Sequence, residues 1–108
     1  MKLTKKQKIM IKVLQLAHNN IKLGEGLCFT LDLLCYNDKI TNEESKIVRA
    51  FMLRYFSSDI GRVWWLSEYD DCGVQTKDTL EYTPDGLRLR KDLFLNAIEF
   101  IKATGITK

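Results

Sequence analysis

The sequence predicts a mainly α-helical protein that forms one compact domain of four helices. Apolar residues recur at three- and four-residue spacing over most of the chain, which is the period of a helix that buries one side. The chain has 108 residues, of which 45% are hydrophobic, so it is long and apolar enough to form a hydrophobic core. We therefore expect a single domain spanning residues 1–108.

The segment 87–103, near the C-terminus, gives the strongest indication of a helix. Its polar residues recur every three or four positions and share one narrow stripe: Arg88, Asp92, Asn96, Glu99 and Lys102. Apolar residues cover more than half of the circumference, whereas an ordinary surface helix needs an apolar band only somewhat over ~100° wide. We expect this helix to be flanked by other elements on two or three sides.

Two further helices are expected in the first third of the chain. Residues 4–23 have an apolar row on one side and a row of lysines on the other, which indicates an amphipathic helix. Thr4 and Gln7 have the spacing of a capping box at its start, and glycines follow its end. The short apolar segment 27–36 is predicted as a helix, although its period does not exclude a strand.

A third helix of this kind is expected over residues 43–56. Thr41 and Glu44 form a capping box, in which the threonine hydroxyl accepts from the amide three residues on and the glutamate reaches back. The polar run 57–59 is expected to break this helix.

Residues between the third and last helices are harder to assign. The cluster 63–66 has the apolar composition of a strand, but residues 67–86 offer few side chains for burial. A connection of that length is usually functional or mobile. Residues 79–82 and 87–89 are candidates for a short β-hairpin across the turn sequence 83–86.

Charge is distributed unevenly along the chain. The net charge is +3, but residues 1–24 contain six lysines and no carboxylate, whereas residues 66–85 contain six acids and one base. These regions are expected to meet, either within one chain or between two copies, so a homo-oligomer is one expected outcome.

No apolar run approaches the ~20 residues of a membrane span, and no signal peptide is recognisable. With an odd number of cysteines, three, the chain is expected in the cytoplasm with reduced thiols.

The residue types that carry catalysis do not form a recognisable motif, so we do not expect an enzyme, a metal or a cofactor. Cys28, Cys35, Cys72 and His18 lack the paired spacing that zinc sites use. No serine or cysteine accompanies His18 in a nucleophile motif.

The most interesting candidates for binding lie just after the third helix: Trp64, Trp65, Glu68, Asp70 and Asp71. Adjacent tryptophans on a strand point to opposite faces, so one would be exposed if the other is buried. Tryptophan contributes strongly at protein interfaces, although anchoring a core is its more frequent role. The carboxylates could hold a hard cation, but a solvated loop is the commoner reading because calcium-loop spacing is absent.

A second set of candidates is basic: Lys8, Lys12, Arg88 and Arg90. Such side chains could hold a phosphorylated signalling nucleotide in an oligomer, or bind nucleic acid weakly. An ordinary solvated face is the more common role of a lysine row, and this one lacks aromatic residues or arginines that would stack on bases. Nucleic-acid binding is therefore not expected. Membrane attachment is not expected either, because the apolar face of the first helix lacks aromatic anchors.

Three short motifs resemble a loose pattern in small proteins of tailed bacteriophages. They are Gly26-Leu27-Cys28, the pair Trp64-Trp65, and residues 86–90 leading into AIEFI. The resemblance implies a compact, mostly helical, cytosolic protein that acts on the host, for example as an inhibitor of a host defence protein. It assigns no role to any residue. The resulting hypothesis is a phage-encoded protein that occupies the surface of a host protein through residues 64–85.

Overall fold

The computed structural model describes residues 3–64, 71–72 and 84–105. Within these ranges the chain forms helices and no strand, so the prediction of a mainly α-helical protein is confirmed. The helices are α1 (Lys5–Asn20), α2 (Leu27–Tyr36), α3 (Asn42–Tyr55), α4 (Ser57–Trp64) and α5 (Pro84–Thr104).

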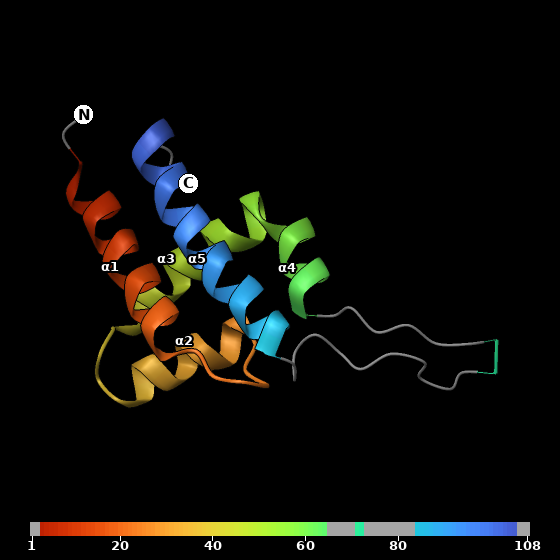
Figure 1. Ribbon diagram of the computed structural model, residues 1–108. Coiled ribbons are helices and arrows are strands. Elements are labelled where there is room, and N and C mark those ends of the chain that lie inside the picture. Colours follow the sequence, from red (N-terminus) through yellow and green to blue (C-terminus); the bar gives the residue numbers. More distant parts are fainter. Residues whose placement is uncertain (1–2, 65–70, 73–83, 106–108) are drawn as a thin grey trace.

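The first and last helices lie side by side and run in opposite directions (Figure 1). One hydrogen bond joins them at each end. Gln7 Nε2 donates to the carbonyl oxygen of Gly105 at 2.7 Å, and Lys91 Nζ donates to that of His18 at 2.9 Å. These bonds place the start of α1 beside the end of α5, and the end of α1 beside the start of α5.

The other helices surround this pair. Helix α4 packs on α5, whereas α3 packs on α1, α2 and α4, and α2 lies across the end of α1 (Figure 1). The expectation that the last helix has neighbours on two sides, here α1 and α4, is confirmed. Its apolar surface is not fully covered, however, because Leu89 and Leu95 are each 38% exposed.

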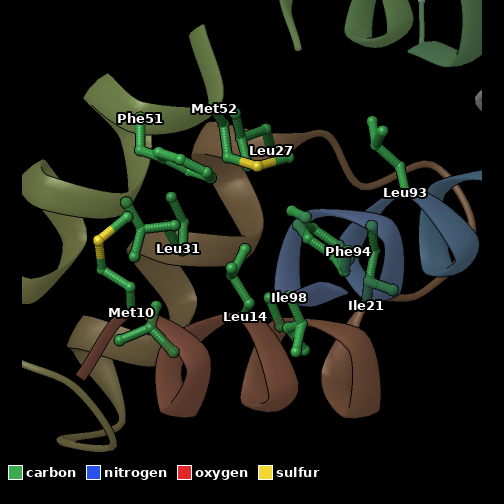
Figure 2. Packing of buried hydrophobic residues seen from close by; sticks show 14 of the residues in the cluster. Met10, Leu14, Ile21, Leu27, Leu31, Phe51, Met52, Leu93, Phe94 and Ile98 are labelled. Carbon is green, nitrogen blue, oxygen red and sulfur yellow. The ribbon is translucent and has the colours of Figure 1, made fainter. Parts of the chain in front are cut away.

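The hydrophobic core receives side chains from all five helices. Leu14 of α1, Leu31 of α2, Phe51 of α3 and Phe94 of α5 are fully buried, and Figure 2 shows them pointing into a shared interior. Helix α4 adds Ile60, which is 8% exposed. Full burial of one such side chain contributes about 1.5–3 kcal/mol.

Both predicted capping boxes are present. Thr4 Oγ1 accepts from the amide of Gln7, and Gln7 Oε1 accepts from the amide of Thr4 at 2.7 Å. Thr41 and Glu44 make the same reciprocal pair at the start of α3. A cap of this type contributes about 1 kcal/mol. Helix α1 ends three residues before the predicted position because Ile21 takes an extended conformation.

The third helix ends at Tyr55, one residue before its predicted end, but residues 57–59 begin a further helix, so the described residues form five helices where four were expected. Only Phe56 leaves the helical conformation, with φ −130° and ψ 20°, and α4 begins at the next residue. Serine and aspartate are favoured at helix starts as well as in turns, so the same residues can begin a helix. Residues 63–64, which were predicted as part of a strand, form the last turn of α4.

The predicted β-hairpin is also wrong, because residues 87–89 lie inside α5. That helix begins at Pro84, followed by Asp85. Proline is favoured in the first turn of a helix, and a carboxylate there complements the helix dipole. The sequence that suggested a turn is therefore a helix start. Residues 79–82, the other half of the predicted hairpin, lie outside the described residues.

Adjacent residues of α5 provide a test of the core. Replacing Phe94, which is fully buried, by alanine should lower the free energy of unfolding by about 3–5 kcal/mol through lost burial and the cavity left behind. Leu95→Ala, on the partly exposed side, should cost about 1 kcal/mol or less. Urea denaturation of both variants measures the difference, and equal losses would contradict the observed orientation of α5.

The end of α2 provides a second test, because Asp38 has a left-handed backbone with φ 58°. The backbone amide of its neighbour Lys39 donates to the carbonyl oxygen of Leu34 at 2.9 Å, which closes the helix end. Glycine takes this conformation without steric cost, so Asp38→Gly should raise the free energy of unfolding by about 0.5–1 kcal/mol. Asn37→Gly is the control: its φ is −89°, so this change should lower stability or leave it unchanged.

Candidate functional site

The predicted protein-binding residues lie mostly outside the described part of the chain. Trp64 is the last residue of α4, and Asp71 is exposed in a short turn. Trp65, Glu68 and Asp70 are among the residues that the structure does not describe. Their role in a contact surface stays a prediction.

The basic candidates are described, and the structure does not bring them together. Lys8 and Lys12 are exposed near the middle of α1, whereas Arg88 and Arg90 lie near the start of α5. Because Lys91 of α5 lies beside His18 and the helices are antiparallel, Arg88 and Arg90 are separated from Lys12 and Lys8 by about 10–20 Å along the helix axis. Arg88 pairs with Asp85 in its own helix at 3.4 Å, so these residues do not form one ligand-binding cluster.

Arg90 is fully buried, which the sequence did not indicate. It belongs to the buried row of α5, together with Gly86, Leu93 and Ala97. Burying a charge is costly unless the charge is paired, and Arg90 is not without a partner. Its burial removes Arg90 from the surface that a dissolved nucleotide would reach.

The cysteines and the histidine do not form a metal site. Cys28 is exposed, and Cys35 Sγ donates to the carbonyl oxygen of Thr41 at 3.7 Å. His18 Nδ1 lies 3.0 Å from Asn19 Oδ1. Across the described ranges, no three His, Cys, Asp or Glu side chains lie close enough to hold a metal ion.

The most unusual surface lies on α2. This helix has one charged residue among ten, Asp32, and its buried side is formed by Leu27, Thr30, Leu31 and Leu34. The opposite side, which we call the outer face of α2, comprises Cys28, Phe29, Asp32, Leu33 and Tyr36. Two aromatic side chains are therefore left uncovered: Phe29 is 49% exposed and Tyr36 is 84% exposed.

A shallow hollow of about 470 Å³ lies on this face, with mainly apolar walls. It is lined by Phe29, Asp32, Leu33 and Tyr36. Phe29, Leu33 and Tyr36 are separated by four and then three residues, so they form one continuous stripe along the helix. An apolar stripe around a hollow is suited to receiving an apolar side chain of a ligand.

Asp32 connects the outer face of α2 to α3. Its Oδ1 lies 3.0 Å from Arg49 Nη2. Both side chains are substantially exposed, so the pair contributes at most about 1 kcal/mol to stability. Leu53, one turn further along α3, is 50% exposed. The apolar stripe is thus bordered by an ion pair on the side of α3.

Sequence reasoning missed this surface although a signal was present. The segment 27–36 is apolar around nearly its whole circumference, which in a water-exposed helix leaves an apolar side without a partner. Helix α2 packs on α1 and α3 with one side only, so the other side of this apolar segment stays exposed.

None of the described helices is long and apolar enough to cross a membrane.

Lys12 is engaged with α3 rather than free to bind a ligand. Its Nζ donates to Glu44 Oε2 at 2.9 Å. This bond, followed by the one from the amide of Thr41, holds the pKa of Glu44 below its ordinary value, although partial burial acts in the opposite direction. Lys12 and Glu44 therefore join α1 to the start of α3.

The lowered pKa predicts how stability depends on pH. A carboxylate with a lowered pKa in the folded state stabilises the fold above its ordinary pKa, and the contribution is lost as the pH falls through the lowered value. Glu44→Gln should therefore cost up to about 1 kcal/mol at pH 7 and progressively less in acid, as urea denaturation at several pH values would show. The control is Glu43→Gln, at an exposed carboxylate without an ion pair in the described part of the chain. A pH-independent loss for Glu44→Gln would contradict the assignment.

Comparison with known proteins does not extend these observations. The chain has no significant match among protein-family models, curated proteins or solved structures. The phage resemblance thus stays a prediction based on three short motifs. The first motif opens α2, the second begins at the last residue of α4, and the third runs along α5 from residues 86–90 to residues 97–101.

Proposed function

We propose that this chain is a binding protein that occupies the surface of another protein, and that the outer face of α2 is its contact surface. The observation that supports this is the pair of uncovered aromatic side chains, Phe29 and Tyr36, on a helix whose other side is anchored in the core. Exposed clusters of this type commonly mark interaction sites, and aromatic residues carry much of the binding energy at interfaces.

The geometry also suits binding because the stripe is on a rigid element. Leu27, Leu31 and Leu34 on the inner side of α2 are between 0% and 5% exposed, so the helix is held firmly while its outer side faces water. A preorganised surface loses little conformational freedom on binding.

The exposed area is sufficient for useful affinity. With about 200 Å² for a complete aromatic side chain, Phe29 and Tyr36 leave about 270 Å² of surface for a partner to cover. At about 25 cal/mol per Å² of apolar surface, covering it contributes at most about 7 kcal/mol before the entropic cost of association, because part of the area belongs to the Tyr36 hydroxyl. Loss of both side chains should therefore weaken binding by much more than tenfold.

The resemblance to phage proteins suggests which kind of protein is bound. On that basis we propose that the partner is a host protein in the cytoplasm of an infected bacterium, and that binding inhibits it, for instance as a defence protein. The acidic sequence 66–85, which follows Trp64 and Trp65, is proposed as a second contact region because it carries six carboxylates.

The proposal is tested by partner capture from a lysate of host cells with matched variants. Phe29→Ser with Tyr36→Ser should reduce the captured partner at least tenfold, measured by quantitative mass spectrometry. Leu89→Ser with Leu95→Ser removes partly exposed apolar residues of α5 and should leave capture unchanged. Thermal denaturation establishes that each variant is folded.

A third variant distinguishes the two contact regions. It combines Trp65→Ala with Asp70→Lys and Asp71→Lys. If this variant alone loses the partner, contact is made by the acidic region and the assignment to α2 is wrong. Capture that survives in both the α2 variant and this variant shows that neither region is the contact surface. A wild-type chain that captures no specific partner contradicts the proposed function itself.

A further inference from the structure

The structure also points to the kind of partner. Resting on the function proposed above, we infer that the outer face of α2 receives an acidic amphipathic helix, whose apolar side covers Phe29, Leu33 and Tyr36 and whose carboxylates reach Lys22 and Lys39. The inference depends on the size of the apolar stripe and on the charges beside it.

The apolar stripe is better matched to one helix than to a second copy of this chain. A stable protein dimer buries about 800 Å² on each partner, whereas Phe29 and Tyr36 together expose about 270 Å². Helix α2 has ten residues and is about 15 Å long, which corresponds to about three turns of a partner helix. Helices that dock on such grooves use apolar anchors at three- and four-residue spacing, the spacing of the stripe itself.

A second hollow, of about 100 Å³, adjoins the stripe and supplies the charge. It lies among the end of α1, the connection that follows and the second half of α2. Its lining is mainly polar and basic: Asn20, Lys22, Glu25, Thr30, Leu33, Leu34, Asn37 and Lys39. Leu33 lines both hollows, so a ligand on the apolar stripe lies directly beside this basic hollow.

The basic hollow has positive charge that the fold does not use. Lys22 and Lys39 are exposed, and neither makes an ion pair in the part of the chain that the structure describes. Glu25 brings one negative charge, and its Oε1 accepts from the backbone amide of Lys22 at 2.8 Å. Two other carboxylates lie outside this lining: Asp32 is paired with Arg49, and Asp38, which precedes Lys39, lines a separate hollow with Lys12 and Glu44. The lining of the basic hollow itself therefore carries one net positive charge, from Lys22 and Lys39 against Glu25.

Carboxylates on a docked helix complement this arrangement. They meet two ammonium groups at the edge of an apolar contact, where such pairs select among partners and speed association more than they add affinity. A helix with lysines in the same positions would place like charges together and would be rejected. The apolar stripe thus provides affinity, and the basic hollow selects partner helices that carry negative charge.

Two synthetic helical peptides of 14 residues test the inference. Both carry leucines at positions i, i+3, i+4 and i+7, and they differ only in having either glutamates or lysines beside this row. Fluorescence anisotropy at physiological salt should show at least tenfold tighter binding of the glutamate peptide to the full chain. Lys22→Glu with Lys39→Glu should abolish or reverse that preference.

The matched control is Lys5→Glu with Lys8→Glu, which makes the same change in net charge on α1. These residues lie about 20 Å or more from Lys22 along the axis of α1. At physiological salt, exposed charges are largely screened from one another beyond the Debye length of ~8 Å. The preference for the glutamate peptide should therefore remain within about twofold. Loss of the preference in this control as well would show a general charge effect and overturn the inference.

The remaining outcomes separate this inference from the proposed function. If both peptides bind equally and Phe29→Ser with Tyr36→Ser removes both, the α2 contact stands but the acidic partner is wrong. If neither peptide binds, the inference is wrong, and partner capture decides the proposed function independently. If sedimentation equilibrium shows a dimer that Tyr36→Ser dissociates, a second copy covers the stripe and the inference is overturned.

Discussion

The antiparallel contact between α1 and α5 is the interaction on which the rest of the structure depends. The two helices are separated by most of the chain, yet they share the longest contact in the fold and are joined at both ends by hydrogen bonds. Each contributes a fully buried alanine, Ala17 and Ala97, and small residues of this kind let helices approach closely. Helices α3 and α4 complete the core around this pair, and α2 closes the end where α1 stops. The positions of the exposed surfaces follow from this arrangement.

Helix α2 has a different relation to the core from the other helices. Its inner side is required for folding, because Leu31 and Leu34 are buried against α1 and α3. Nothing in the fold requires Phe29 or Tyr36 on the opposite side, where polar residues would be less costly in water. Apolar side chains that the fold does not need are the feature that favours binding over a purely structural role. The lysines beside this surface, Lys22 and Lys39, favour a partner with negative charge.

Much of the fold could be predicted from local chemistry. The capping pairs Thr4–Gln7 and Thr41–Glu44 fixed two helix starts, and the bounds of α2 agree with its apolar segment. The errors arose where the same local sequence is compatible with two structures. The serines that follow Phe56 are common both in turns and at helix starts. The same holds for the pair Pro84 and Asp85. Arg90 was not recognised as buried because burial of a charge depends on partners distant in sequence. The α2 surface was missed because periodicity identifies which side of a helix is apolar, but not which side remains uncovered.

The pairing of α1 with α5 also determines when the protein can fold during synthesis. A ribosome that has completed α1, α2 and α3 has made most of the buried leucines and methionines, but the main packing partner of α1 is still missing. The apolar row of α1 therefore stays accessible until nearly the whole chain has emerged, and the contacts that close the core span almost the full sequence. The nascent protein is consequently most prone to aggregation or to chaperone capture in the interval between the third helix and the last.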